Sequence, residues 1–305
     1  MAERDLVVLG DCNPDLLLRG NVVPAFGQVE QIVDEACFEI GGSGAIVAAG
    51  AARLGLRCGL ISVVGDDDLG RLQLDALSKR GVDVSTVVVD RSLSTGLTVI
   101  LSRGDDRAIL TSLGAIDALD APLIDITALE SARHVHVSSY YLQRRLRATL
   151  EPLLDAARKG GASVSLDPNW DPDETWDGGL LALLPVLDYL FVNEQEVRKI
   201  GRDDDVVAAA RALASEGPTV VVKLGALGGL LVSGAHVCRA VALSRPVIDT
   251  TGAGDSFDAG FLCGLLAGWK PARCLEFACV CGSLSVSVAG LGGQPTLDEA
   301  LRDCA

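Results

Sequence analysis

Positive charge is scarce in this sequence of 305 residues. It contains 26 lysines and arginines against 41 aspartates and glutamates, which gives a formal net charge of −15. Partners such as nucleic acid or anionic lipid are recognised by basic surfaces. We therefore expect no nucleic-acid partner and no membrane partner, and we look for small molecules or proteins instead.

Long apolar runs and a basic amino terminus are missing as well. The most apolar stretches are interrupted by Asp188, Lys223 or Asp258, so none reaches the roughly 20 apolar residues of a membrane-spanning helix. Two acidic residues lie within Met1 to Asp5, where a signal peptide would be basic. The nine cysteines include no Cys-x-x-Cys pair. These features predict a cytoplasmic protein whose thiols are reduced.

The common nucleotide and hydrolase motifs are also absent. None of the five lysines follows a glycine, so there is no P-loop, and position 257 is Phe where G-x-G-x-x-G requires its third glycine. The segment Gly41-Gly42-Ser43-Gly44 is followed by Ala45 and lacks the last glycine of a nucleophile elbow.

Short β-branched runs alternate with longer amphipathic stretches along the whole chain, which is typical of an α/β fold with a mostly parallel central sheet. Because parallel strands are covered on both faces, they are almost wholly apolar. The predicted strands are Leu6–Leu9, Cys58–Val64, Val135–Val137, Ser163–Leu166, Tyr189–Val192 and Thr219–Lys223, and the predicted helices are Ala45–Leu54, Leu69–Lys79, Arg144–Lys159 and Val206–Glu216.

Two segments depart from this rhythm, at about residues 13–40 and 87–113. Their apolar period is closer to two than to 3.6, and the second reads as two strands joined by a turn at 103–106. We interpret them as a small antiparallel sheet that covers a cleft or another subunit. No linker or repeat divides the chain, so we expect one domain over residues 1–305 with this sheet inserted in it.

The most informative segment is Asp249-Thr-Thr-Gly-Ala-Gly-Asp-Ser-Phe-Asp-Ala-Gly260, a glycine-rich turn that enters a helix. The backbone amides of Gly252, Ala253 and Gly254 would lie at the helix amino terminus, where free N–H groups and the helix dipole bind anions such as phosphate. Asp255 would then either cap the helix or take a proton from an attacking hydroxyl. The residues alone leave both interpretations open.

This segment resembles the carboxy-terminal signature of the ribokinase-like carbohydrate kinase family, and weaker resemblances follow in the family's order from about residue 6 to 296. These are Gly10-Asp-Cys-Asn-Pro-Asp15, Gly41-Gly42-Ser43-Gly44 with Ala51-Ala-Arg-Leu-Gly55, Gly65-Asp-Asp-Asp-Leu-Gly70, Asp167-Pro-Asn169, Asn193-Glu-Gln-Glu196, Val222-Lys-Leu-Gly225 with Gly228-Gly229, and Gly292-Gly-Gln-Pro295. The resemblance implies a three-layer α/β/α fold with a β lid, and a homodimer paired through that lid.

The resemblance also implies an ATP-dependent kinase and assigns residues to roles. Asp255 would be the catalytic base, and the amides of Gly252, Ala253 and Gly254 would stabilise the transferring phosphoryl group. The further implied residues are, for the substrate, Asn13, Asp15, Gly41, Gly42, Asp167 and Asn169; for the nucleotide, Asn193, Lys223, Gly225, Gly228 and Thr250; for Mg²⁺, partly through water, Glu196 and Asn193; and for a monovalent cation such as K⁺, Asp249. The residues alone allow a local structural role for three of these pairs. Asn193 and Glu196 could form a helix-capping box. Asn13 and Asp15 could form an Asx turn beside Pro14, and Asp167 and Asn169 could form a turn around Pro168.

The implied acceptor is the hydroxyl of a small neutral sugar, and the departures from the family pattern concern this acceptor. Ile46 occupies the position at which the family usually carries a sugar-contacting Asn, and Asp171 stands where members acting on acidic sugars carry Arg. A phosphosugar stays open because any of Arg103, Arg107 and Arg144 could hold a phosphate. A nucleoside also stays open; a vitamin kinase or a non-catalytic nucleotide-binding regulator is the more distant alternative.

Two further features have structural alternatives. His134 and His136 alternate along one strand and could bind a metal, but only three histidines and no neighbouring ligand favour packing. Trp170 and Trp176 flank the 171–177 loop, where they could stack on a sugar ring or anchor the loop.

Overall fold

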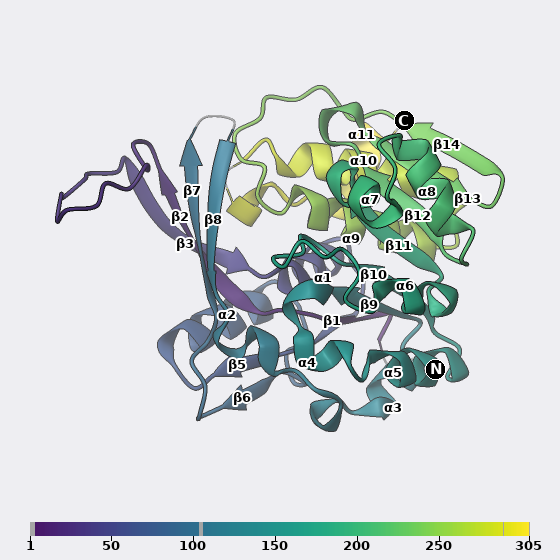
Figure 1. Ribbon diagram of the computed structural model, residues 1–305, viewed down its shortest axis with the longest axis horizontal. Helices are drawn as coiled ribbons and strands as arrows, with labels where there is room; N and C mark the ends of the chain where they lie inside the picture. Colours follow the sequence, from purple (N-terminus) through teal and green to yellow (C-terminus); the bar gives the residue numbers. More distant parts are fainter. Residues whose placement is uncertain (1–3, 104–105, 289, 305) are drawn as a thin grey trace.

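The central sheet of the computed structural model is built from the apolar runs (Figure 1). The structure describes residues 4–103, 106–288 and 290–304. The strand order is β14-β13-β12-β11-β10-β9-β1-β4. The six strands from β12 to β4 in this order pair in parallel, whereas β13 and β14 pair with their neighbours in antiparallel fashion. The strands are β1 (Leu6–Leu9), β4 (Cys58–Ile61), β9 (His134–Ser138), β10 (Ser163–Asp167), β11 (Tyr189–Asn193), β12 (Thr219–Lys223), β13 (Gly229–Ser233) and β14 (His236–Ala240).

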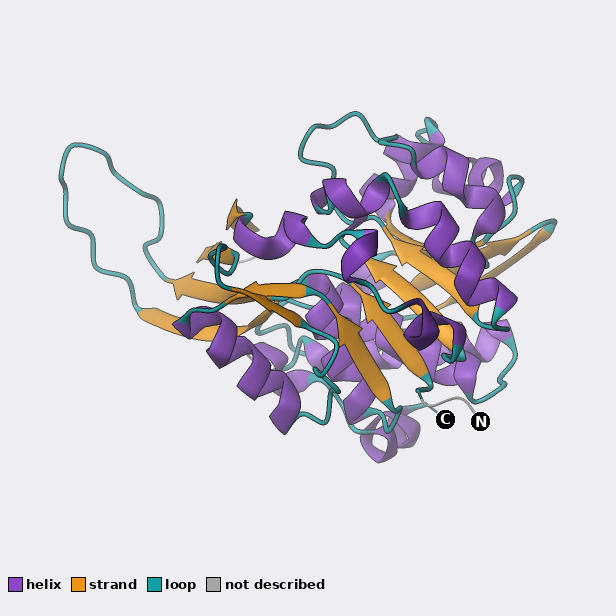
Figure 2. Cartoon of the chain, turned by 90° about the horizontal axis from the view of Figure 1, so that it is seen from below, coloured by secondary structure: helices purple, strands orange, loops and turns teal. Residues whose placement is uncertain are grey.

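Helices cover both faces of this sheet, so the predicted three-layer α/β/α arrangement is confirmed (Figure 2). One face packs on α1 (Ser43–Arg53), α2 (Asp68–Lys79), α9 (Ala253–Leu266), α10 (Pro271–Ser285) and α11 (Leu297–Asp303). The other packs on α3 (Ile126–Glu130), α4 (Arg144–Arg147), α5 (Leu150–Lys159), α6 (Leu180–Leu183), α7 (Glu194–Gly201) and α8 (Val206–Ala214). Each strand alternates its side chains between the two cores, as Val7 and Val8 illustrate.

A second sheet of four strands, which we call the lid, stands beside the main body (Figure 1). Its order is β3-β2-β7-β8, with β2 (Asn13–Arg19), β3 (Glu35–Gly41), β7 (Leu97–Arg103) and β8 (Asp106–Ser112). The two hairpins are antiparallel, but β2 and β7 pair in parallel, so the sheet is mixed rather than wholly antiparallel. The turn predicted at 103–106 includes positions 104 and 105, which lie outside the described residues.

The boundaries of the second lid segment need correction. The sequence assigns residues 87–113 to the lid, whereas β6 (Val88–Asp90) pairs in parallel with β5 (Val63–Gly65) in a separate two-stranded sheet. The run predicted as one strand at Cys58–Val64 therefore divides into β4 and β5, and the helix predicted at Arg144–Lys159 divides into α4 and α5. A period of two indicates a strand but not the sheet that the strand joins.

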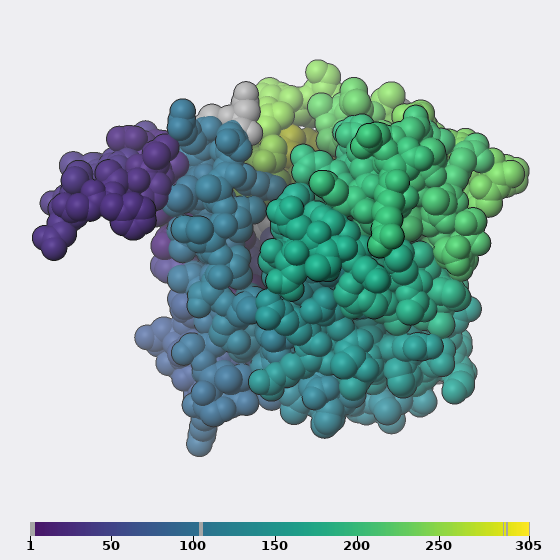
Figure 3. Space-filling model, viewed as in Figure 1, coloured from purple at the N-terminus to yellow at the C-terminus, as the bar shows by residue number. Residues whose placement is uncertain are grey.

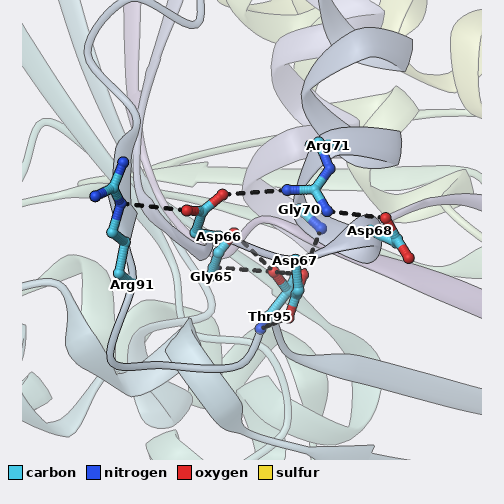
Figure 4. A network of polar contacts seen from close by, with 8 residues as sticks. All are labelled: Gly65, Asp66, Asp67, Asp68, Gly70, Arg71, Arg91 and Thr95. Atoms are coloured by element: carbon cyan, nitrogen blue, oxygen red, sulfur yellow. Dashed lines mark hydrogen bonds and ion pairs between the residues drawn. The ribbon is translucent and has the colours of Figure 1, made fainter.

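The turn at Gly65–Gly70 fixes the base of the lid (Figure 4). Asp67 caps α2 by accepting from the Gly70 N–H at 2.9 Å, and it also accepts from the backbone N–H and the hydroxyl of Thr95 at 2.8 and 2.7 Å. The Gly65 N–H donates to the same hydroxyl at 2.9 Å. Because Thr95 lies two residues before β7, this network ties the entry of the lid to the main body.

The interior holds both strand histidines and most of the cysteines. His134 and His136 are fully buried, and their rings hydrogen-bond to Ser163 and Ser165 at 2.6 to 2.7 Å, so they pack in the core. No group of three or more potential metal ligands occurs among the described residues. All nine cysteines are free thiols. Within the described ranges no helix combines the length and apolar character needed to cross a membrane.

Candidate active site

A cavity of about 1180 Å³ lies between the lid and the carboxyl ends of the parallel strands. Figure 3 shows the surface hollowed between the blue lid strands and the teal and green segments of the main body. The predicted site residues that line it are Asp15, Gly42, Asp167, Asn169, Asn193, Glu196, Lys223, Gly225, Thr250, Gly252, Ala253, Gly254 and Asp255. The cavity therefore brings together residues separated by up to 240 positions of sequence.

The amino terminus of α9 forms one end of the cavity. Gly252 is the N-cap residue with φ of 70°, a left-handed conformation that favours glycine. The Ala253 N–H donates to the Thr250 carbonyl at 3.3 Å, whereas the N–H groups of Gly252 and Gly254 have no acceptor among the described residues. Open amides at a helix amino terminus can receive an anion, and the Ala253 amide is engaged in the turn itself.

Asp255 lies in the first turn of α9 and does not cap the helix, because Gly252 occupies the N-cap position. Its Oδ1 accepts a hydrogen bond from the Ser43 hydroxyl at the start of α1. Burial raises the pKa of Asp255 to about 7, against the lowering effects of the Ser43 hydrogen bond and the Lys223 charge. A carboxyl with this pKa exchanges protons near neutral pH, which suits a general base.

Asn193 and Glu196 form the capping box that the sequence left as an alternative. The Asn193 side chain accepts from the Gln195 and Glu196 amides at 2.9 Å, and Glu196 Oε2 accepts from the Asn193 N–H at 2.7 Å. Glu196 Oε1 accepts no hydrogen bond from a described residue and lies on the cavity. Burial, with the nearby Asp167 charge, raises the pKa of Glu196 to about 7.

A buried ion cluster lies beneath the anion site. Lys223 Nζ donates to Asp167 and, at 3.1 Å, to Asp258 Oδ2 on α9. Sequence reasoning missed Asp258. Its position three residues after Asp255 was the available signal, because residues three apart share a helix face.

The other end of the cavity is formed by the first strand turn and the lid. Asp15 lies on the cavity, and burial, with the charges of Asp11 and Asp255, raises its pKa well above the usual range. Asn13 does not line the cavity, because its amide donates to Thr98 Oγ1 at 3.1 Å and to the Pro14 carbonyl. Gly41 lies behind Asp15, where an added Cβ would approach the Asp15 Cγ to 2.2 Å.

Asp11 is a second residue that sequence reasoning did not assign, although it belongs to the quoted turn. Its carboxylate lines the cavity and accepts from the Gly44 N–H at 2.9 Å. Ile46 also faces the cavity, so an apolar side chain stands where the family has an amide. This end of the cavity therefore combines two buried carboxyl groups with an apolar wall.

Arg107 and Arg144 line the cavity, whereas Arg103 does not. Trp170 lines it with 45% of its surface exposed, and Trp176 is buried and packs edge-to-face on Trp170 at 4.8 Å. Trp176 thus anchors the loop, and stacking of Trp170 on a sugar ring stays a prediction. Asp171 accepts from three backbone N–H groups of the 173–176 turn and holds that loop in place.

Gly228 and Asp249 lie outside the cavity lining. The Asp249 oxygens accept from the Thr251 N–H at 2.9 Å, from the Gly290 N–H at 3.0 Å and from the Arg19 guanidinium at 2.8 Å. A guanidinium from lid strand β2 therefore neutralises the carboxylate to which the sequence assigns a monovalent cation. K⁺ binding at Asp249 stays a prediction.

A lid over the carboxyl edge of an α/β sheet, an open helix amino terminus and a carboxyl group that titrates near pH 7 define a small-molecule phosphotransferase. The comparisons specify the class further. Residues 3–297 match the model of the pfkB family of carbohydrate kinases. The chain belongs to this family, whose members are phosphotransferases with an alcohol group as acceptor.

Individual relatives agree with this assignment. The chain is 32% identical over 316 residues to a fructokinase of Klebsiella pneumoniae, covering 97% of both chains. It superposes on the ribokinase of Arabidopsis thaliana, solved with ribose and ATP, with a TM-score of 0.85, 26% identity and coverage of 100% and 99%. A structure from E. coli, provisionally described as Ribokinase II and solved with ATP and Mg²⁺, superposes with a TM-score of 0.87 at 24% identity and 98% coverage of both chains.

Proposed function

We propose that this protein transfers the γ-phosphoryl group of ATP to a hydroxyl of a small neutral sugar. One observation carries the proposal: Asp255 stands one residue after the open Gly254 amide, inside a cavity that the lid covers. A group that removes a proton and a group that receives phosphate charge are thus adjacent. The fructokinase and ribokinase relatives support a sugar as acceptor.

The mechanism follows from the positions of these groups. The sugar hydroxyl approaches Asp255, which takes its proton as the oxygen attacks the γ-phosphorus, and the bond between that phosphorus and the bridging oxygen breaks so that ADP leaves. The amides of Gly252 and Gly254, at the positive end of the α9 dipole, stabilise the charge on the transferring group. Asp11 and Asp15 accept hydrogen bonds from other hydroxyls of the sugar and hold it in line.

Glu196 and Asn193 fit a Mg²⁺ site of few protein ligands. Glu196 has an open oxygen on the cavity, and Mg²⁺ keeps several waters when one or two carboxylates hold it. The E. coli structure with ATP and Mg²⁺ supports Mg²⁺ as the ion that accompanies the nucleotide. Bound there, the ion would neutralise phosphate charge.

The test is ADP release from ATP and Mg²⁺ across neutral sugars, phosphosugars, sugar acids and nucleosides. We expect release to depend on one neutral sugar and to fall by at least about 100-fold in Asp255→Asn, because the base is lost. Asp75→Asn, an exposed carboxylate on α2, is the matched control and keeps full activity. Nucleotide binding without release for any acceptor would instead identify a regulator, and retained turnover in Asp255→Asn would refute the base.

A phosphosugar is the second candidate, favoured by Arg107 and Arg144 on the cavity wall. Arg107 donates to the Thr250 hydroxyl at 3.4 Å, and no acceptor faces Arg144 among the described residues. If the acceptor carries a phosphate, Arg144→Ala raises its KM by about tenfold, since a charge-assisted hydrogen bond is worth 1.5–3 kcal/mol. An unchanged KM excludes this role for Arg144.

The lid supports the predicted homodimer. Along its strands Asp15, Thr98 and Thr111 face the cavity, so the alternate residues face outward. This outward face is apolar and consists of Leu16, Leu18, Ala36, Phe38, Val99, Leu101, Ala108 and Leu110, with Phe38 and Leu110 exposed by 50% and 60%. A second copy of the chain would cover it.

Light scattering tests this dimer. We expect Leu110→Glu to give a monomer and Leu72→Glu, an exposed change on α2, to leave the dimer intact. A dimer that survives Leu110→Glu would place the interface elsewhere. Cytoplasmic location stays a prediction from the sequence.

A further inference from the structure

The buried ion cluster of Lys223, Asp167 and Asp258 has no role in the mechanism above. Side-chain exposure is 14% for Lys223, 1% for Asp167 and 0% for Asp258. The three residues come from the ends of β12 and β10 and from the first turns of α9. The cluster thus joins two strands of the sheet to the helix that carries the open amides.

An ammonium group has three N–H donors, and two acceptors face Lys223 Nζ among the described residues. The third donor is free, and Lys223 lines the cavity. Its position is set closely by the helix: a Cβ added to Gly254 would lie 3.5 Å from Nζ. The Lys223 ammonium group therefore lies beside Gly254 on the same cavity wall, next to the place where an anion would bind.

Burying this cluster costs desolvation free energy that apolar side chains would not cost. Replacing a buried ion group by apolar side chains of similar volume is often neutral or stabilising. Burial is the largest single influence on Asp167 and opposes its ionisation, but the Lys223 charge and the hydrogen bonds to the carboxylate together outweigh it and lower the Asp167 pKa, whereas burial raises the pKa of Asp258 well above its usual range. Lys223 and Asp167 thus form an ion pair, and Asp258 supplies the second acceptor for the Lys223 ammonium group.

We propose that Lys223 is a direct donor to the γ-phosphate of bound ATP, and that Asp167 and Asp258 are positioning residues that hold its ammonium group beside Gly254. The inference rests on the proposed function, because the γ-phosphate is the anion that this site would receive. The lysine adds a full charge to the partial charge of the helix terminus. Asp167 acts through Lys223 here and not as a sugar ligand.

The test compares ATP, a non-hydrolysable ATP analogue and ADP, each with Mg²⁺, by titration calorimetry at one pH. Only the first two carry a γ-phosphate, so the ratio of their affinity to that of ADP measures contacts with this group. Lys223→Met should lower this ratio about tenfold, the lower end of a charge-assisted hydrogen bond. Lys199→Met, an exposed lysine on α7, is the matched control and keeps the ratio.

A second variant separates this role from folding. Lys223→Met leaves Asp167 without its cation and lowers the melting temperature. The double variant, Lys223→Met with Asp167→Asn, removes both charges of this ion pair and restores the melting temperature. We expect the affinity ratio to stay low in the double variant, because the donor is still missing. A ratio that recovers with stability, or that never changes, overturns the proposal and leaves a structural ion pair.

The outcomes also separate this inference from the proposed function. If the ratio falls as expected but no acceptor releases ADP, Lys223 holds the γ-phosphate and the sugar-kinase proposal fails. If sugar-dependent release occurs and the ratio is the same in all variants, the kinase stands and the role of Lys223 is refuted. A wild-type protein that binds no ATP overturns both.

Discussion

Asp255 should destabilise the protein above neutral pH, and this can be measured without any substrate. Burial holds its folded-state pKa at about 7, compared with a reference value of 3.8. Between these two values the folded protein keeps a proton that the unfolded chain has lost. Stability linked to this group is therefore fully present below about pH 4 and is lost as the pH rises through 7.

The size of the Asp255 pKa shift sets the size of the expected change in the free energy of unfolding. Three pKa units correspond to about 4 kcal/mol, and we expect about 2 to 4 kcal/mol because the carboxyl is partly open to the cavity. Asn at position 255 has no proton to lose and still offers an oxygen to the Ser43 hydroxyl. At pH 8, Asp255→Asn should thus be more stable than the wild type by that amount, or by about 3 to 6 °C in Tm at about 2.1 cal/mol/K of unfolding entropy per residue.

Differential scanning calorimetry of the ligand-free proteins at pH 5 and pH 8 measures this directly. At pH 5 the gain should shrink to about a third, because the wild-type carboxyl is then protonated in the fold. Asp75→Asn, the exposed control on α2, should show no gain at either pH. A gain of equal size at both pH values, or no gain at pH 8, would refute the buried titration on which the base assignment depends.

Three further predictions concern the same cavity. Ser43→Ala removes a hydrogen bond that lowers the pKa of Asp255, so the acid limb of the kcat profile should move up by about one pH unit; an unmoved limb would mean that another group titrates. Ile46→Asn returns an amide to the acceptor wall and should lower the sugar KM about fivefold with little change in kcat, and a KM that stays the same or rises contradicts this placement. Arg19→Ala breaks the ion pair between β2 and Asp249 and should raise the acceptor KM about fivefold, as steady-state kinetics would show, whereas unchanged kinetics would separate this pair from lid closure.

The fold was predictable because its strongest signals are local. Strands such as Leu6–Leu9 and Thr219–Lys223 were predicted with the observed bounds, since a short apolar run flanked by helices has few other solutions in an α/β domain. The sheet that Val88–Asp90 joins was not predictable, because this strand pairs with β5, which lies 25 residues earlier in the sequence. The division of 144–159 at Ala148 and Thr149 likewise leaves no apolar signal in the sequence.

The site residues were predictable only where they belong to a local sequence motif. The turn at Gly252–Asp255 lies at the predicted place, and the capping box of Asn193 and Glu196 follows from spacing alone. The contact of Asp258 with Lys223 joins residues 35 positions apart on different elements, and no local pattern encodes it. Asn13 shows a different limit of the resemblance. The resemblance identifies the residue, but it does not predict that the Asn13 amide points toward Thr98 instead of into the cavity.

The ion pair between Arg19 and Asp249 spans 230 residues, and this separation has a consequence for synthesis on the ribosome. Strand β2 leaves the exit tunnel early, but its parallel neighbour β7 follows some 80 residues later, and α9 comes only after residue 252. A nascent chain therefore carries an unfinished lid with an apolar outer face until β8 has been made, and Arg19 then waits for Asp249 through most of the remaining translation. The α9 end of the cavity is completed last, so a chain truncated before α9 would contain Asp11 and Asp15 but not the open amides of Gly252 and Gly254.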